Sequence, residues 1–237
     1  MSPTGTGAGL DPTRAREQAR REFDAWAGSY DRSLLNHFMF GPSYAVLMEE
    51  IARWYSEQRR PFRVLDVGAG TGTLAAMVAR SSLPGEAVGL DYAPAMSAEA
   101  RRKAAVEGLD RRARFITGDS ERLPFADAAF DLVTCSNSFH HYPHPRTVVR
   151  DMRRVLRPGG RLVVIDGFRD NVIGWFVFDV VITRVERDVH HAPWWAMQEY
   201  FLGAGLANIR RRKFNFWFPL LATIGDATDG APGPKGE

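Results

Sequence analysis

Short apolar runs alternate with helix-like stretches through the middle of the chain. The runs are typical of buried strands, whereas the stretches between them repeat apolar residues every three or four positions. The strands are expected at 62–67, 86–91, 113–120, 130–138 and 162–166, and the helices at 73–80, 94–107 and 145–156. This alternation predicts a doubly wound α/β fold, whose ligands bind outside the carboxyl ends of the strands.

The first strand runs into a glycine turn, residues 68–72, and the turn leads into a helix. Glycine permits a positive φ and lets a ligand approach the main chain, and a helix N-terminus presents unpaired N–H groups. The turn therefore suits a nucleotide-like ligand. A dinucleotide fingerprint needs Gly-x-Gly-x-x-Gly, whereas this spacing is Gly-x-Gly-x-Gly followed by Thr73. Asp66, before the turn, would repel a pyrophosphate and suits a cationic amino-acid group.

Acidic residues also follow the next two strands. Asp91, 19 residues beyond the last glycine of the turn, is placed to accept both ribose hydroxyls. Asp119 can accept the exocyclic N–H of adenine and Ser120 can bond a ring nitrogen, although Asp119 alone would be taken for a cap or turn residue. Tyr92 and Met96 could close the pocket over adenine, a role that competes with plain packing. Together these residues predict a nucleoside site.

Several of these segments resemble the class I S-adenosylmethionine-dependent methyltransferases, in particular the small-molecule family that includes the ubiquinone and menaquinone C-methyltransferases. The similar segments are 30–31, 64–72, 89–91, 118–125, 130–133 and 155–160. The resemblance implies S-adenosyl-L-methionine as cofactor and a mostly parallel seven-stranded sheet with helices on both faces. It also implies a final antiparallel hairpin, expected near 207–213 and 214–224. The residues expected around the cofactor are Tyr30, Asp66, Gly68, Ala69, Gly70, Asp91, Tyr92, Met96, Gly118, Asp119, Ser120 and Asn137.

The sequence outside this core predicts a lid, a cap and two disordered ends. The ends are residues 1–12 and 226–237, and the main domain is 59–225. A helical lid is expected over 13–58, with an apolar connector at 34–41 that is either core or a cover over a cavity. The aromatic insertion at about 170–203 predicts a small helical cap beside the site, which suits an apolar or aromatic acceptor.

Two histidines follow the fourth strand, where the transferred methyl group should point. Methyl transfer from a sulfonium depends mainly on positioning and desolvation, but a phenol, hydroxyl or acidic carbon needs a base. His140 and His141 are the candidates, and the alternative is that one packs against the cofactor and the other faces solvent. A metal site formed with His190 and His191 is disfavoured, because adjacent histidines cannot easily turn to one ion, and no metal is expected.

Composition narrows the acceptor and the compartment. Cys135 is the single cysteine and lies in an apolar run, which argues against disulfides, cysteine-based metal sites and thiol-dependent methylation. The segment 136–138 lacks the Pro-Pro-aromatic element of enzymes that methylate amino groups of nucleic-acid bases, so no nucleic-acid partner is expected. The basic clusters at 101–103, 111–114 and 210–213 are interpreted as solvated faces. Without a signal pattern or a membrane-length apolar run, a cytoplasmic protein is expected.

The main interpretation is therefore a methyltransferase acting on a small-molecule acceptor by O-, C- or N-methylation. One alternative is a lipid or quinone methyltransferase at a membrane surface, which would make contact through Trp175, Phe176 and the aromatic run 214–218. Others are a protein that binds S-adenosylmethionine without catalysis and a nicotinamide oxidoreductase, which the glycine spacing opposes. A monomer and a homodimer both remain open. The interpretation requires Asp66, Asp91 and Asp119 to converge on one ligand along the glycine turn.

Overall fold

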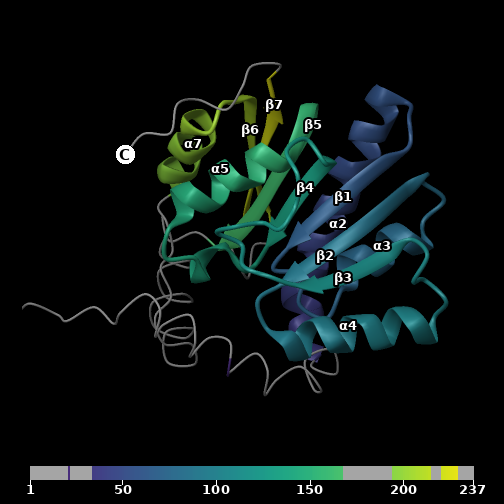
Figure 1. The fold of residues 1–237 in the computed structure, drawn as a ribbon. Coiled ribbons are helices and arrows are strands. Elements are labelled where there is room, and N and C mark those ends of the chain that lie inside the picture. The colour runs from purple at the N-terminus through teal and green to yellow at the C-terminus, as the bar shows by residue number, and fades with distance from the viewer. Residues whose placement is uncertain (1–20, 22–33, 168–193, 215–219, 229–237) are drawn as a thin grey trace, which may run out of the picture.

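Seven strands form one sheet at the centre of the computed structural model, which describes residues 21, 34–167, 194–214 and 220–228 (Figure 1). The strand order is β3-β2-β1-β4-β5-β7-β6. The strands are β1 Phe62–Val67, β2 Gly85–Asp91, β3 Ala113–Thr117, β4 Phe130–Ser136, β5 Leu156–Gly167, β6 Leu206–Phe214 and β7 Leu220–Ala227. All five strands predicted in the first part of the chain are present.

The sheet is mixed rather than parallel throughout. Strands β1 to β5 pair in parallel, whereas β7 is antiparallel to both β5 and β6. Only residues 215–219 separate β6 from β7, and a parallel pair would need a crossover of about a dozen residues or more. The predicted final hairpin is therefore confirmed, and β7 extends two residues beyond residue 225, where the domain was expected to end.

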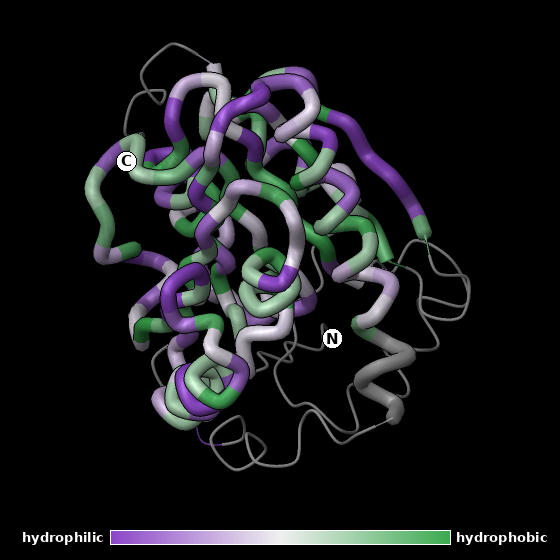
Figure 2. Tube along the Cα trace, turned by 90° about the vertical axis from the view of Figure 1, so that its right-hand side faces the viewer, coloured by the Kyte–Doolittle hydropathy of each residue, from purple (hydrophilic) through white to green (hydrophobic). Residues whose placement is uncertain are grey.

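Helices cover both faces of the sheet. The helices are α2 Leu34–Gln58, α3 Thr73–Arg80, α4 Pro94–Val106, α5 Pro145–Val155 and α7 Trp194–Gly203, with a short 3-10 helix, η2, at Phe139–His141. One apolar cluster joins α2, α3 and α4 to one face, and a second joins α5 and α7 to the other. Because strand side chains alternate, Val64 faces the first cluster and Leu65 the second. Figure 2 shows apolar segments running through the interior.

The lid region differs from the prediction. Residues 34–41, expected as a connector, are the first part of one continuous helix, α2, which includes Pro42. A proline inside a helix removes one backbone hydrogen bond, but the second half of α2 is firmly packed. Trp54 is fully buried there and donates its Nε1–H to the Gly159 carbonyl at 3.2 Å. The part of the predicted lid before residue 34 lies outside the described residues, apart from Arg21.

The start of β5 and the place of the predicted cap also differ from the prediction. Strand β5 begins at Leu156 rather than at residue 162, because Phe130 of β4 pairs with Leu156 and Leu132 pairs with Arg161 across a bulge. The described part of the predicted cap is helix α7, which packs against α5 and the sheet. It contributes no residue to the described wall of the pocket presented below, and residues 168–193 are outside the description.

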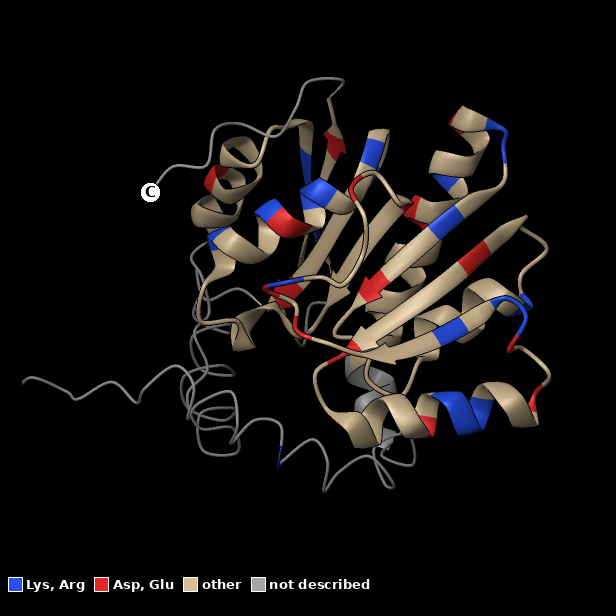
Figure 3. Ribbon diagram, in the orientation of Figure 1, with Lys and Arg blue, Asp and Glu red and all other residues tan. Residues whose placement is uncertain are grey.

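Most residues of the basic clusters are exposed, and some of them also bond to the protein itself. Arg112 donates to main-chain carbonyls of the α3–β2 connection, including those of Ala79 and Gly85. On the edge strand β6, Arg210 pairs with Glu50 and Arg212 pairs with Glu49 of α2. Figure 3 shows blue and red residues interspersed over the described elements. Within the described part of the chain, no helix combines the length and the apolar character needed to cross a membrane.

Candidate functional site

A pocket opens at the carboxyl ends of β1, β2, β3 and β4, with the first half of α2 over it. Its wall contains the first four residues of the glycine turn, the end of β2, the residues just after β3, the polar end of β4 and part of η2. The lining residues are Phe40, Tyr44, Gly68, Ala69, Gly70, Thr71, Leu90, Asp91, Tyr92, Ala93, Met96, Gly118, Asp119, Ser120, Ser136, Asn137, Ser138, His141, Tyr142 and Pro143. The pocket is therefore at the edge of the sheet that the fold predicts.

The glycine turn needs glycine for two different reasons. Gly68 and Gly70 have φ values of 74° and 53°, which favour glycine. A Cβ at Gly68 would lie 2.2 Å from Ser138 Oγ, so the turn and the end of β4 are in close contact there. A Cβ at Gly70 would meet no atom within 4 Å. The main chain at Gly70 therefore has open space in front of it, where a ligand can approach.

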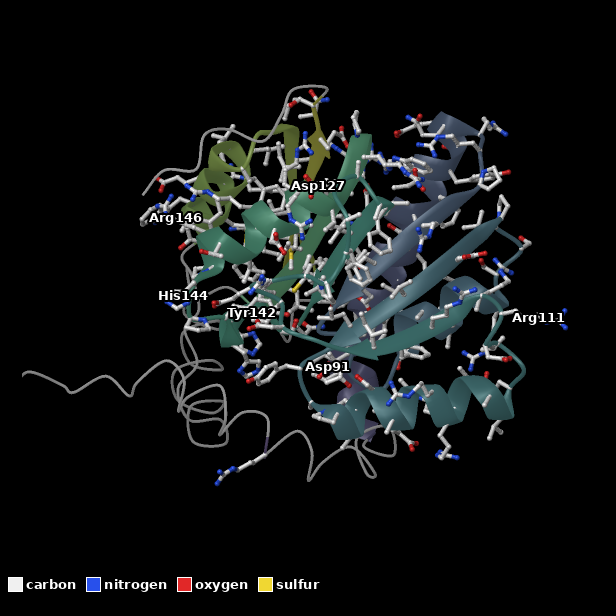
Figure 4. All side chains as sticks on the ribbon, viewed as in Figure 1. Asp91, Arg111, Asp127, Tyr142, His144 and Arg146 are labelled. Carbon is white, nitrogen blue, oxygen red and sulfur yellow. The ribbon has the colours of Figure 1, made fainter. Side chains whose placement is uncertain are left out.

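Asp91 ends β2 beside this open space. Its Oδ2 accepts the Gly70 N–H at 2.7 Å and its Oδ1 accepts the Ala93 N–H at 2.9 Å. These bonds fix the carboxylate along the turn, and carboxylate oxygens are suitable acceptors for ligand hydroxyls. Figure 4 shows Asp91 and Tyr142 near the same edge of the sheet, with Asp127 at the opposite edge. This arrangement is suitable for a pair of ribose hydroxyls.

The predicted adenine residues lie around the neighbouring part of the pocket. Asp119 follows β3 and accepts the Glu121 N–H at 2.9 Å, so it forms a turn as well as part of the wall. Ser120 is buried beside it, and Met96 of α4 is buried in the wall. Tyr92 is 44% exposed and stands at the rim. These residues supply polar groups and an apolar surface on one side of the pocket.

Asp66 does not join the other two acids on the wall. It lies within β1 opposite Thr134 of β4, is 5% exposed and accepts the Thr134 Oγ1–H at 2.8 Å. Burial raises the pKa of this carboxyl to about 7, although the Thr134 hydrogen bond opposes the shift. Of the three acids expected to converge, Asp91 and Asp119 line the pocket, whereas the Asp66 side chain bonds Thr134 of β4 and is close enough to Asp91 for the two charges to interact.

The end of β4 is held by main-chain and side-chain bonds. Asn137 has a φ of 54°, which Asn tolerates better than most residues, and its N–H bonds the Ile165 carbonyl at 2.8 Å. Its amide Nδ2 donates to Ser136 Oγ at 2.8 Å and to Ser43 Oγ of α2 at 3.2 Å. The predicted residue Asn137 therefore reaches the pocket and also joins the sheet edge to the helix above it.

The two candidate bases occupy different environments. His141 lines the pocket, whereas His140 does not. The His140 ring Nδ1 lies 2.7 Å from Asp166 Oδ1, and the His140 N–H donates to Asp166 Oδ2 at 2.8 Å. The two imidazole centroids are 4.1 Å apart. His141 is therefore the histidine that can meet a pocket ligand, and His140 packs against it from a fixed position.

The remaining candidates are the cysteine and the possible metal ligands. Cys135 is buried as predicted, and burial raises its pKa to about 12, which makes it a poor nucleophile. No group of three or more His, Cys, Asp or Glu side chains that could hold a metal occurs among the described residues. Tyr30, His190 and His191 lie outside the described residues, so those predictions stay untested.

Comparisons with known proteins indicate the family to which the chain is similar. Residues 65–164 match the family model described as "Methyltransferase domain". The chain carries a methyltransferase domain. This domain is similar to the class I S-adenosylmethionine-dependent methyltransferases, in particular to the ubiquinone and menaquinone C-methyltransferases. The methyl donor implied for this domain is S-adenosyl-L-methionine.

Two curated relatives and one solved structure illustrate the likeness. Demethylmenaquinone methyltransferase of Thermus thermophilus is 44% identical over 109 residues, 46% of this chain and 49% of that protein. The uncharacterized methyltransferase YcgJ of Bacillus subtilis is 38% identical over 162 residues, 68% of this chain and 63% of that protein. The chain thus spans about half to two thirds of these relatives. A SAM-dependent methyltransferase from Aquifex aeolicus shares the fold, with a TM-score of 0.61 at 16% identity over 93% of this chain and 100% of that one.

The methyltransferase domain offers suitable groups for this donor. Asp91 suits the ribose, Asp119 and Ser120 suit the adenine, and the open main chain at Gly70 leaves room between them and the end of β4. Sequence reasoning missed Ser43, Ser138, Tyr142 and Asp166. The polar end of β4 could have indicated Ser138, and the acid ending β5 could have indicated Asp166. Ser43 carries no local signal, because its role depends on packing of α2 over the sheet.

Proposed function

We propose that the protein transfers a methyl group from S-adenosyl-L-methionine to a small-molecule acceptor of apolar or aromatic character. The observation that carries the proposal is the order of groups along one pocket: Asp119 after β3, Asp91 after β2, the glycine turn after β1 and His141 after β4. Neighbouring strands thus present an adenosine-binding side, an open turn and a candidate base in sequence.

The protein would contribute mainly by aligning the acceptor with the donor and by excluding water from the pocket. When bound, the donor supplies an electrophilic methyl group, which breaks its bond to sulfur as the acceptor atom forms the new bond. Such a displacement needs the acceptor in line and shielded from water. Phe40 and Tyr44 of α2 and Pro143 after η2 contribute apolar surface to the pocket wall. They would exclude water and favour an apolar or aromatic acceptor.

His141 is proposed as the base that accepts the proton of the acceptor. It is the histidine on the pocket wall, and an imidazole is suited to proton transfer near neutral pH. His140 supports its position, because Asp166 fixes the His140 ring and that ring lies 4.1 Å from the His141 ring. The step requires no covalent intermediate on the protein.

A hydroxylated aromatic ring of the quinol class is the first acceptor to test. The Thermus thermophilus relative is named a demethylmenaquinone methyltransferase, and its likeness covers 46% of this chain. The aromatic lining at Phe40, Tyr44 and Tyr142 also suits a flat ring. The membrane-surface alternative depends largely on residues outside the description and stays a prediction.

Calorimetry with S-adenosylmethionine, S-adenosylhomocysteine and NAD tests the cofactor. We expect heat with the first two and none with NAD, and heat with NAD alone would overturn the proposal. Mass spectrometry of reactions with reduced demethylnaphthoquinones, phenols and aliphatic amines then tests transfer. A gain of about 14 Da on an aromatic acceptor is expected, from replacement of hydrogen by methyl. Cofactor binding without transfer to any acceptor would instead support a non-catalytic binding protein.

A further inference from the structure

Ser43 is a buried hydroxyl in the helix that covers the pocket. Its exposed fraction is 0%, and it lies between Phe40 and Tyr44 along α2, both of which line the pocket. Buried hydroxyl groups are nearly always hydrogen-bonded, and losing the partner of one carries a cost. Ser43 Oγ accepts a hydrogen bond from Asn137 Nδ2 at 3.2 Å. The hydroxyl therefore connects α2 to the end of β4 at the pocket.

This contact helps to orient the Asn137 amide. The nitrogen has two hydrogens, and it donates to Ser136 Oγ and to Ser43 Oγ. The main chain is fixed by the bond from the Asn137 N–H to the Ile165 carbonyl. Among the described residues, none donates a hydrogen bond to the amide oxygen. Asn137 lines the pocket, so its amide oxygen could accept a hydrogen bond from a ligand there.

The ligand group that meets this oxygen follows from the strand order. Asp91 and Asp119 follow β2 and β3, which lie on one side of β1, whereas Asn137 follows β4 on the other side. If the adenosine is held by the residues after β2 and β3, the amino-acid end of the donor would extend past the glycine turn toward β4. Its α-ammonium is a charged donor, and an amide oxygen is a suitable acceptor for it.

We propose that Ser43 is a positioning residue for the cofactor: it turns the Asn137 amide so that its oxygen receives the α-ammonium of S-adenosylmethionine. This inference rests on the proposed function. It adds the Asn137 amide oxygen as the group that recognises the amino-acid end of the donor. It also links that recognition to α2, because Ser43 belongs to the helix over the pocket and Asn137 to the sheet edge. Displacing α2 would release the amide and weaken binding of the amino-acid end.

Two ligands separate this role from a merely structural one. S-adenosylhomocysteine has the amino-acid end, whereas 5′-methylthioadenosine has the same nucleoside and lacks it. We expect Ser43→Ala to lower the affinity for S-adenosylhomocysteine about threefold to tenfold. Asn137→Gly should lower it at least about tenfold, as for loss of a hydrogen bond to a charged group. Glycine tolerates the positive φ at position 137, so this variant removes the amide without backbone strain. Binding of 5′-methylthioadenosine should change less than about twofold.

The matched control is Ser56→Ala on the same helix. Ser56 Oγ bonds the Arg53 carbonyl at 2.7 Å on the exposed surface, so this variant should bind both ligands as the parent does. In the Asn137→Gly background, Ser43→Ala should have no further effect, because its target is gone.

Each outcome separates the two proposals. The positioning role would be overturned if Ser43→Ala and Asn137→Gly lowered the affinities for both ligands equally. An unchanged affinity for S-adenosylhomocysteine would also overturn it. If Ser43→Ala does not fold, the two affinities of Asn137→Gly decide the role of the amide, and Ser43→Cys tests the orienting contact. Failure of the parent protein to bind either ligand would instead refute the proposed function itself.

Discussion

Replacing Asp66 with Asn should remove a pH dependence from the stability of the protein. Asp66 is buried within β1, and its main polar contact is the hydrogen bond from Thr134 at 2.8 Å. The amide oxygen of Asn can accept the same bond, and Asn has almost the same volume as Asp. The substitution therefore changes mainly the ability of the group to ionise. Asn at this position is neutral at every pH, whereas Asp must ionise in an apolar setting as the pH rises.

The magnitude follows from the pKa shift. Burial raises the pKa of Asp66 from 3.8 to about 7 in the folded protein. Between these values the folded state binds more protons than the unfolded state, so stability falls as the pH rises. Each unit corresponds to about 1.4 kcal/mol, which gives a loss of up to about 4 kcal/mol between about pH 4 and pH 7. Above about pH 7 this contribution is constant, because Asp66 is ionised in both states.

Urea unfolding at half-unit steps from pH 5 to pH 8, at constant ionic strength, measures the effect. The free energy of unfolding of Asp66→Asn minus that of the parent should rise by about 1.4 kcal/mol per pH unit up to about pH 7 and then level off. Asp110→Asn is the control, because Asp110 is exposed in the connection between α4 and β3. Parallel stability curves for the parent and Asp66→Asn would refute the reasoning, since they would mean that Asp66 ionises equally in both states.

Three further variants test the site. Asp91→Asn should weaken S-adenosylmethionine about tenfold to a hundredfold in calorimetry, because the ribose hydroxyls lose a charged acceptor, and an unchanged affinity would contradict its role. Gly68→Ala should lower the melting temperature more than Gly108→Ala: both have positive φ, but only the first places a Cβ 2.2 Å from Ser138 Oγ. His141→Gln should reduce turnover about a hundredfold or more with little change in cofactor affinity, and unchanged turnover would reject it as the base.

The cofactor side of the pocket could be predicted because its signals are local. The spacing of the glycine turn and the acids after β2 and β3 are visible in the sequence, and a parallel sheet brings its strand ends together. Asp66 shows the limit of that reasoning. It lies only two residues before Gly68, yet whether it lines the pocket depends on which neighbour its side chain faces. That neighbour is Thr134, which is 68 residues away and becomes adjacent only through the β1–β4 register.

The lid helix was predicted less well because its signals conflict. Gly41 and Pro42 are ordinary helix breakers, and nothing local indicates that one helix runs through them. Packing decides otherwise: Leu47, Ile51 and Trp54 bury α2 against the sheet, and the helix continues through the proline. The contact between Ser43 and Asn137 depends on this packing and spans 94 positions. No pattern within either segment could have indicated it.

The two halves of the pocket therefore differ in how far the sequence alone predicts them. The half that suits the donor is made from consecutive strand ends, where one residue type at each end is enough to suggest a ribose or adenine contact. The other half is made from α2, η2 and the end of β4, whose side chains meet only after the chain has packed. A motif can thus indicate the reaction class while leaving the acceptor open. Replacing Phe40 or Tyr44 with another residue should consequently alter acceptor preference more than donor affinity. These side chains reach the pocket from the helix and not from the strand ends.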